Sequence, residues 1–222
     1  MFELIALLFL TTEVFAETRQ KIVVVDTGVT QEQVNKPYMC EKGVLNAIKD
    51  DGLTVHPHGS NIVGLIGKQI NIKKYCVLSI RYNSGYSSGP DSTDSLKKSF
   101  SMVLKEKNVL WVNVSVTGEG FDPEELSLVK KINEKNIGMS LAAGNEGLNL
   151  NEPCGIFPAC YRLNVPNKSL YRVIGSSTSR ESFKSNYGNI VTDKEDGVQQ
   201  GTPALTGTSQ ATAIYTGKLF KE

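Results

Sequence analysis

Short apolar runs alternate along the chain with longer segments in which apolar residues recur every three or four positions. The first run, Lys21–Val25, is β-branched and shows no alternation with polar residues. This pattern is typical of a strand that is buried on both faces of a parallel sheet. Similar runs predict further strands at Tyr75–Ile80, Val109–Val116, Ile137–Ala143 and Tyr171–Ile174.

The segments between these runs predict helices. Asp94–Lys107 carries four apolar residues on one face, as an amphipathic helix does. Asp122 is a candidate N-cap, with Pro123 in the first turn and Glu125 at the third position, and this helix is predicted to end near Lys135. Further helices are predicted from His58 onward, at Ala211–Lys221 and, as a short one, at Val44–Lys49.

Strands and helices therefore alternate through most of the chain. This order predicts an α/β fold with a parallel β-sheet sandwiched by helices. Residues 148–169 contain three prolines and two cysteines and are expected to form a loop. No repeat or low-complexity linker divides the sequence, so residues 17–222 are expected to form a single domain.

Composition narrows the class of protein. The 222 residues suffice for one domain with a sizeable core, and 40% hydrophobic with 21% charged residues is ordinary for a globular protein. A net charge of +1 argues against a nucleic-acid or membrane-surface partner. No apolar run is long enough for a membrane span.

The first 16 residues resemble a secretory signal peptide. Leu4–Leu10 is a short apolar core, and Val14–Ala16 supplies small residues for cleavage after Ala16. The segment has no basic residue before the apolar core, and a buried N-terminal helix is the alternative. The first interpretation predicts a secreted protein, extracellular or periplasmic.

Four cysteines support export to an oxidising compartment. Cys40, Cys76, Cys154 and Cys160 could form two disulfides in three pairings. The short spacing of the last two favours a local Cys154–Cys160 bond, which leaves Cys40–Cys76. Four free buried thiols are the alternative. No histidine is close to a cysteine in sequence, so a Cys/His zinc site is not expected.

Polar residues with catalytic chemistry stand in glycine-bearing turns. Asp26 follows the first strand, and functional groups gather at the carboxyl ends of parallel strands. His58 opens a predicted helix, Asn145 follows another strand, and Ser209 stands at the start of the last helix. Each has a structural alternative: a turn-capping Asp, a packed His or a helix-capping Ser. His56 and His58 could suggest a metal, but no third ligand is evident, and no cofactor is expected.

These turns contain four motifs that closely resemble those of the subtilisin-like serine peptidases, the subtilases. The motifs are Val24–Gly28, His58–Ser60 with Gly64, Ala142–Gly147 and Gly207–Ala211. The order Asp, His, Ser is the one known for subtilisin. The resemblance covers roughly residues 21 to 217 and implies a subtilisin-like fold.

The resemblance implies a serine endopeptidase. His58 would take the proton of Ser209 during attack on a peptide carbonyl, and Asp26 would orient and stabilise the imidazole ring. The Asn145 side chain and the Ser209 backbone N–H would stabilise the oxyanion, and catalysis would proceed through an acyl-enzyme.

The resemblance also implies how a peptide or protein substrate would bind. One wall of the S1 pocket is expected from Ser115, Val116, Thr117 and Gly118, and the other from Ala142, Ala143 and Gly144. Tyr82–Tyr86 would flank the substrate on the other side, and the peptide would add as a strand. Ile156 stands where relatives often have glycine, which predicts a shallow S1 pocket that prefers small or modest apolar side chains.

The sequence departs from the family pattern in three places. Only Glu17–Gln20 separates the expected cleavage site from the first strand, which leaves no room for a propeptide. The chain ends 13 residues after Ser209, with Ala213 where proline is common. The segment from His58 to Tyr75 is too short for the calcium-binding loop of many relatives.

These departures leave two further expectations open. A partner or a second copy could cover the edges exposed in such a trimmed domain. The chain could also be a non-catalytic or partner-activated peptide-binding module on the same fold. A structural α/β protein with coincidental motifs is the remaining alternative.

Overall fold

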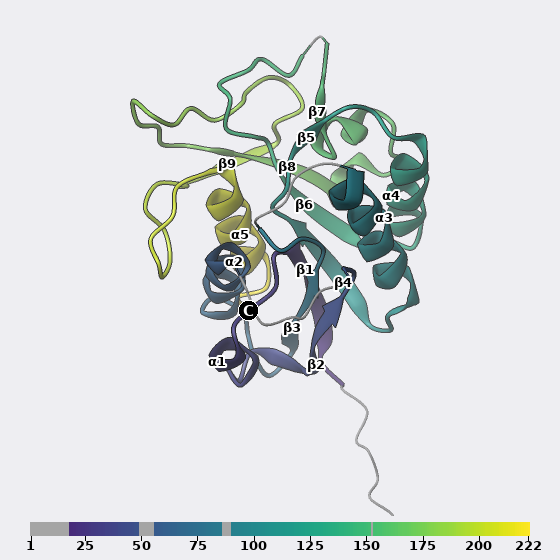
Figure 1. Cartoon of the computed structure of the whole chain (residues 1–222), viewed down its shortest axis with the longest axis vertical. Helices are drawn as coiled ribbons and strands as arrows, with labels where there is room; N and C mark the ends of the chain where they lie inside the picture. The colour runs from purple at the N-terminus through teal and green to yellow at the C-terminus, as the bar shows by residue number, and fades with distance from the viewer. Residues whose placement is uncertain (1–17, 49–55, 86–89, 152) are drawn as a thin grey trace, which may run out of the picture.

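The computed structural model describes residues 18–48, 56–85, 90–151 and 153–222 (Figure 1). The expected signal peptide lies outside this part of the chain. Within the described residues, no helix combines the length and the apolar character that crossing a membrane would require.

The centre of the fold is a seven-stranded sheet in which all neighbouring strands run parallel (Figure 1). Its spatial order is β2–β3–β1–β4–β6–β8–β9. The strands are β1 (Gln20–Asp26), β2 (Met39–Asn46), β3 (Tyr75–Arg81), β4 (Val109–Val114), β6 (Gly138–Ala142), β8 (Tyr171–Ser176) and β9 (Asp193–Glu195). The five strands expected from the sequence are among them, so the α/β class and the parallel sheet are confirmed.

Helices cover both faces of the sheet (Figure 1). One face carries α2 (Pro57–Gly67) and α5 (Thr208–Leu219), and the other carries α3 (Pro90–Lys105) and α4 (Pro123–Glu134). The fully buried residues of β1 alternate between the two layers. Ile22 and Val24 pack in the core with α2 and α5, whereas Val23 and Val25 pack in the core with α3 and α4. This explains the apolar run without alternation.

The predicted helix at Val44–Lys49 is wrong for the residues that the structure describes. Val44, Leu45 and Asn46 belong to β2 and pair with β3, after a register shift that follows Met39. Gly43 has a positive φ of 61°, which bends the chain within this irregular edge strand. The short helix α1 (Gln31–Val34) precedes it instead.

The segment expected to be a loop between residues 148 and 169 contains short ordered elements. Ile156–Phe157 forms β7, which pairs antiparallel with β5 (Gly118–Glu119) in a separate two-stranded sheet. Two 3₁₀ helices follow, η1 (Ala159–Leu163) and η2 (Lys168–Leu170). Strand β9 was likewise not expected, because its three residues Asp193–Glu195 are all polar.

Two disulfides are present, Cys40–Cys76 and Cys154–Cys160. They are the pairs that the sequence favours. The first ties edge strand β2 to β3 across 36 residues, and the second closes a local loop of 6. Among the described residues no cysteine is free.

Candidate active site

The site begins at the carboxyl end of β1, where Asp26 is almost completely buried. Its Oδ1 accepts a hydrogen bond from the backbone N–H of Thr27 at 2.7 Å and lies 2.8 Å from Nδ1 of His58. Because Asp26 contacts Nδ1, the other ring nitrogen of His58, Nε2, remains available for a different partner. An orienting carboxylate and an imidazole are therefore joined.

His58 is positioned by the way helix α2 begins against the turn after β1. The Thr27 hydroxyl donates to the carbonyl of His56 at 3.1 Å and accepts from the Gly59 N–H at 3.0 Å. Gly59 is required here, since a Cβ at this position would lie only 2.1 Å from the carbonyl oxygen of Gly28. The motif glycine thus lets the helix approach the strand end closely enough for the Asp–His contact.

The surroundings of His58 alter its basicity. Burial of the ring opposes protonation, but the charge of Asp26 and the hydrogen bond to it outweigh this effect and raise the pKa of His58. An imidazole with a raised pKa is a stronger base than a free histidine.

The second histidine has a structural role. His56 is the N-cap of α2, and its Nδ1 accepts a hydrogen bond from the backbone N–H of His58 at 3.2 Å. Its ring also packs against Gly85, where an added Cβ would lie 2.2 Å from the His56 Cβ. Among the described residues, no group of three His, Cys, Asp or Glu side chains could hold a metal ion.

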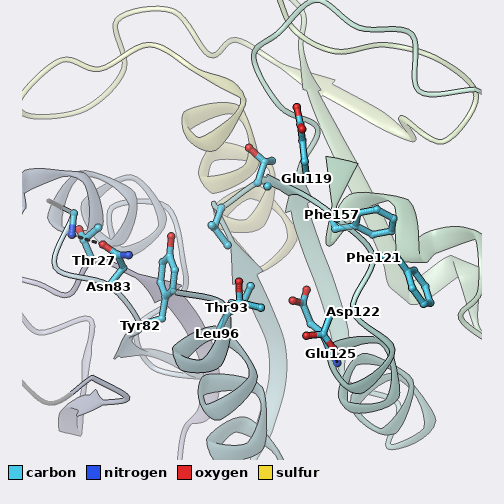
Figure 2. Close-up of a pocket in the computed structure, with 15 residues that line it drawn as sticks. Thr27, Tyr82, Asn83, Thr93, Leu96, Glu119, Phe121, Asp122, Glu125 and Phe157 are labelled. Carbon is cyan, nitrogen blue, oxygen red and sulfur yellow. Dashed lines mark hydrogen bonds between the residues drawn. The ribbon is translucent and has the colours of Figure 1, made fainter. Parts of the chain in front are cut away.

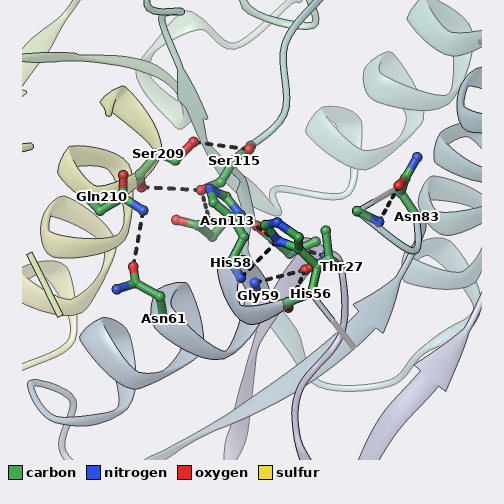
Figure 3. Close-up of polar contacts among 12 residues, drawn as sticks. Thr27, His56, His58, Gly59, Asn61, Asn83, Asn113, Ser115, Ser209 and Gln210 are labelled. Atoms are coloured by element: carbon green, nitrogen blue, oxygen red, sulfur yellow. Dashed lines mark hydrogen bonds and ion pairs between the residues drawn. The ribbon is translucent and has the colours of Figure 1, made fainter. Parts of the chain in front are cut away.

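Ser209 stands in the first turn of α5, beside the residue that follows β4. Its hydroxyl donates to the carbonyl of Ser115 at 3.2 Å, and the Ser115 hydroxyl donates to the carbonyl of Ser209 at 3.3 Å (Figure 3). Within the described part of the chain, no hydrogen bond joins Ser209 to the His58 ring. The rotamer of Ser209 thus directs the hydroxyl to the main chain instead of the imidazole.

Helices α2 and α5 are locked together one residue beyond Ser209. Gln210 donates through Nε2 to Oδ1 of Asn61 at 3.1 Å, and both side chains are buried (Figure 3). Asn61 in turn donates to the carbonyls of Gln200 and Pro203. Because His58 and Ser209 each precede a member of this amide pair closely, the pair fixes the two helix starts relative to each other.

Asn145 is held beside the start of α5 by Thr208. Oδ1 of Asn145 accepts from the Thr208 N–H at 2.8 Å and from the Thr208 hydroxyl at 3.0 Å. The same hydroxyl oxygen accepts from the Gly144 N–H at 3.1 Å. Both contacts occupy the amide oxygen, and among the described residues nothing accepts from Nδ2. The side chain is therefore oriented with its donor available.

Asn186, which no sequence pattern identified as a site residue, stabilises the turn that contains Asn145. Asn186 is fully buried, donates to the carbonyl of Ala143 and to the Glu146 carboxylate, and accepts from the N–H groups of Glu146 and Leu148. No local sequence pattern predicts this role for an asparagine, because its partners lie about 40 positions away in the chain.

A pocket of about 680 Å³ lies between Tyr82 and the segment after β4 (Figure 2). Thr27, which follows Asp26, belongs to its lining, whereas Asp26, His58, Asn145 and Ser209 do not. Val116, Thr117 and Gly118, expected to bind substrate, line it, as do Tyr82 and Phe157. The lining does not include Ser115, Ala142, Ala143, Gly144 or Ile156.

Ile156 is buried in a small apolar cluster with Leu150, Cys160 and Ile190. Its proposed position on the floor of an S1 pocket stays a prediction. Tyr86, the far end of the expected flanking segment, lies outside the described residues.

No protein-family model matches the chain, and no curated protein matches it. The functional assignment therefore depends on the residues and their geometry.

Proposed function

We propose that this protein is a secreted serine endopeptidase of the subtilisin-like type, with Asp26, His58 and Ser209 as catalytic triad. The main support is the 2.8 Å contact between Oδ1 of Asp26 and Nδ1 of His58 at the carboxyl end of β1. Ser209, in the first turn of α5, contacts Ser115 at the carboxyl end of the neighbouring strand β4. Three residues of the required kinds, far apart in sequence, come from adjoining turns at one edge of the fold.

In the proposed reaction, the Ser209 hydroxyl leaves the Ser115 carbonyl and donates to the free ring nitrogen of His58. Catalytic hydrogen bonds often form only when substrate is bound, so the absence of this bond in the free protein does not oppose the proposed role. Oγ attacks the peptide carbonyl, His58 takes its proton, and the imidazolium then protonates the leaving amine. Water hydrolyses the resulting ester by the same sequence of proton transfers.

The tetrahedral oxyanion would be stabilised by Nδ2 of Asn145 and the backbone N–H of Ser209. Thr208 fixes the amide oxygen in advance, so the donor needs no reorganisation during the reaction. The N-terminus of α5 adds a favourable partial positive charge.

The competing function is a peptide-binding module without catalysis. One observation favours it: Ser209 donates to Ser115 and not to His58. Hydrolysis of a peptide library separates the two functions. Wild type and Ser177→Ala, which removes an exposed hydroxyl outside the site, should cleave it, and Ser209→Ala should not. Binding of peptides without cleavage by any of the three proteins would favour the module.

A further inference from the structure

The pocket between Tyr82 and the segment after β4 contains a buried carboxyl group that the proposed mechanism does not use. Glu125 belongs to the pocket lining and is only 4% exposed. Its Oε1 is buried and has no hydrogen-bond partner among the residues that the structure describes. Leaving such a group unpaired is costly, so its retention in a pocket wall calls for a reason.

The usual structural role of a glutamate at this position is filled by another residue. Glu125 is the third residue of α4, where a carboxylate commonly bonds back to the N–H of the N-cap. Here the N–H of the N-cap Asp122 donates to the Tyr161 hydroxyl at 3.1 Å. Glu125 is thereby released from capping, and Figure 2 shows it beside Asp122 at the end of the pocket formed by α3 and α4.

The charges around Glu125 do not neutralise it. Lys97 forms ion pairs with Asp94, Asp122 and Glu124, at 3.1–3.2 Å. Asp122 is further satisfied by the N–H groups of Glu124 and Glu125. Glu119 and Glu125 remain without an ion pair among the described residues, and no Lys, Arg or His belongs to the lining of the pocket.

The walls of the pocket suit a long aliphatic stem. Leu96, Val116, Phe157 and the ring of Tyr82 contribute apolar surface to the same pocket as Glu125, beside polar side chains. A lysine or arginine side chain packs its aliphatic stem against apolar surface while its charged end remains free to bind a polar partner. The unpaired carboxylate of Glu125 in the pocket wall offers that partner.

We propose that Glu125 is a specificity-determining residue, and that this pocket takes a Lys or Arg side chain of the peptide substrate. This proposal rests on the proposed function, because Val116–Gly118 and Tyr82 are the segments expected to flank the bound peptide. Because the expected S1 wall Val116–Gly118 also lines this pocket, we place the selected residue on the amino side of the scissile bond.

The test compares cleavage of peptides that carry Arg, Lys, norleucine or Gln at each of the four positions before the scissile bond. Wild type is assayed at pH 8 beside Glu125→Gln, which is nearly isosteric, and Glu134→Gln, which removes an exposed carboxylate at the far end of α4, outside the pocket lining. At one position wild type should prefer Arg and Lys over norleucine by about 10- to 100-fold in kcat/KM, as expected for hydrogen bonds to a charged group. Glu125→Gln should lose this preference, and Glu134→Gln should keep it to within about twofold.

A preference that is the same in Glu125→Gln, or a wild-type preference for norleucine at every position, would overturn the proposal while leaving the peptidase assignment intact. If no variant cleaves, the peptidase assignment fails. Binding of the same peptides by fluorescence anisotropy then tests the pocket separately. Tighter binding of Arg peptides to wild type than to Glu125→Gln supports it, and equal binding contradicts it. Thermal melting establishes that each variant is folded.

Discussion

At the scale of single residues, the proposed catalytic mechanism depends on the pair Asp26 and His58. The carboxylate fixes the ring through Nδ1 and favours its charged form. This contact makes the site sensitive to pH and to any change that removes the charge of Asp26.

The raised pKa of His58 predicts the acidic limb of the pH profile. The base must be neutral to accept a proton, so kcat/KM should fall as pH drops through the pKa of His58, with a midpoint above the ordinary value of 6.5. Asp26→Asn should move the midpoint lower and reduce kcat by about 10⁴-fold, because the ring loses its orienting charge. A midpoint that does not move in Asp26→Asn would contradict this role.

The orientation of Asn145 predicts a loss in turnover when its amide is removed. Asn145→Ala should lower kcat by about 100- to 1,000-fold with little change in KM, since the donor acts on the transition state. Asn145→Asp keeps the oxygen that accepts from Thr208 but removes the donor, so it should lose as much. A change confined to KM in both variants would show that the residue only binds substrate.

At the scale of elements, the structure shows why some features could be predicted from sequence and others could not. Local sequence patterns were enough to predict four turns, since each combines a strand or helix end with small residues. These turns carry Asp26, His58, Asn145 and Ser209. The strand at Val44–Asn46 could not be predicted in this way, because its pairing with β3 is decided by distant contacts. Nor could the unpaired state of Glu125 be predicted, because Tyr161, which accepts from the N–H of the N-cap Asp122 in its place, is distant in sequence.

Helix α4 predicts a dependence of stability on pH. Burial, followed by the charge of Asp122, raises the pKa of Glu125 to about 7, with Lys97 opposing. The groups facing it also include the hydroxyls of Tyr161 and Tyr171. Both are uncharged in this range, because the ordinary pKa of a tyrosine is about 10 and burial raises it further. The pKa of Glu125 is higher in the folded state than in the unfolded state. Its contribution to folding stability is therefore fully present below pH 4.5 and is lost as pH rises through 7.

Glu125→Gln should therefore match wild type near pH 5 and be more stable at pH 8, by on the order of 2 kcal/mol. Urea unfolding at the two pH values measures the difference. Equal stability of the two proteins at pH 8 would mean that the carboxylate is not buried as described.

At the scale of the whole molecule, the fold is a seven-stranded parallel sheet between two helical layers, with a separate two-stranded sheet and two disulfides that close loops of different length. In the chain-entropy model, a cross-link stabilises more when it closes a longer loop. Replacing Cys40 and Cys76 by serine should cost about 4 kcal/mol, and replacing Cys154 and Cys160 about 2 kcal/mol. Urea unfolding of both double variants checks the order, and a larger loss for the local bond would contradict it.

The alternation of strands and helices was enough to predict the α/β class and the parallel sheet. The subtilisin-like assignment remains a proposal that rests on four motifs and on the Asp26–His58 contact. The edge strands β2 and β9 escaped prediction because short polar or interrupted segments become strands only when a neighbouring strand offers its hydrogen bonds.

Covalent labelling can establish whether Ser209 is an activated nucleophile, which the proposed peptidase function requires. The disulfide-bonded protein would be treated with a fluorophosphonate serine probe, and the modified residue located by peptide mass spectrometry. We predict one adduct, on Ser209, which disappears in Ser209→Ala, falls steeply in His58→Ala and persists in Ser177→Ala. No adduct on the folded wild-type protein, or an adduct that forms equally fast in His58→Ala, would contradict it.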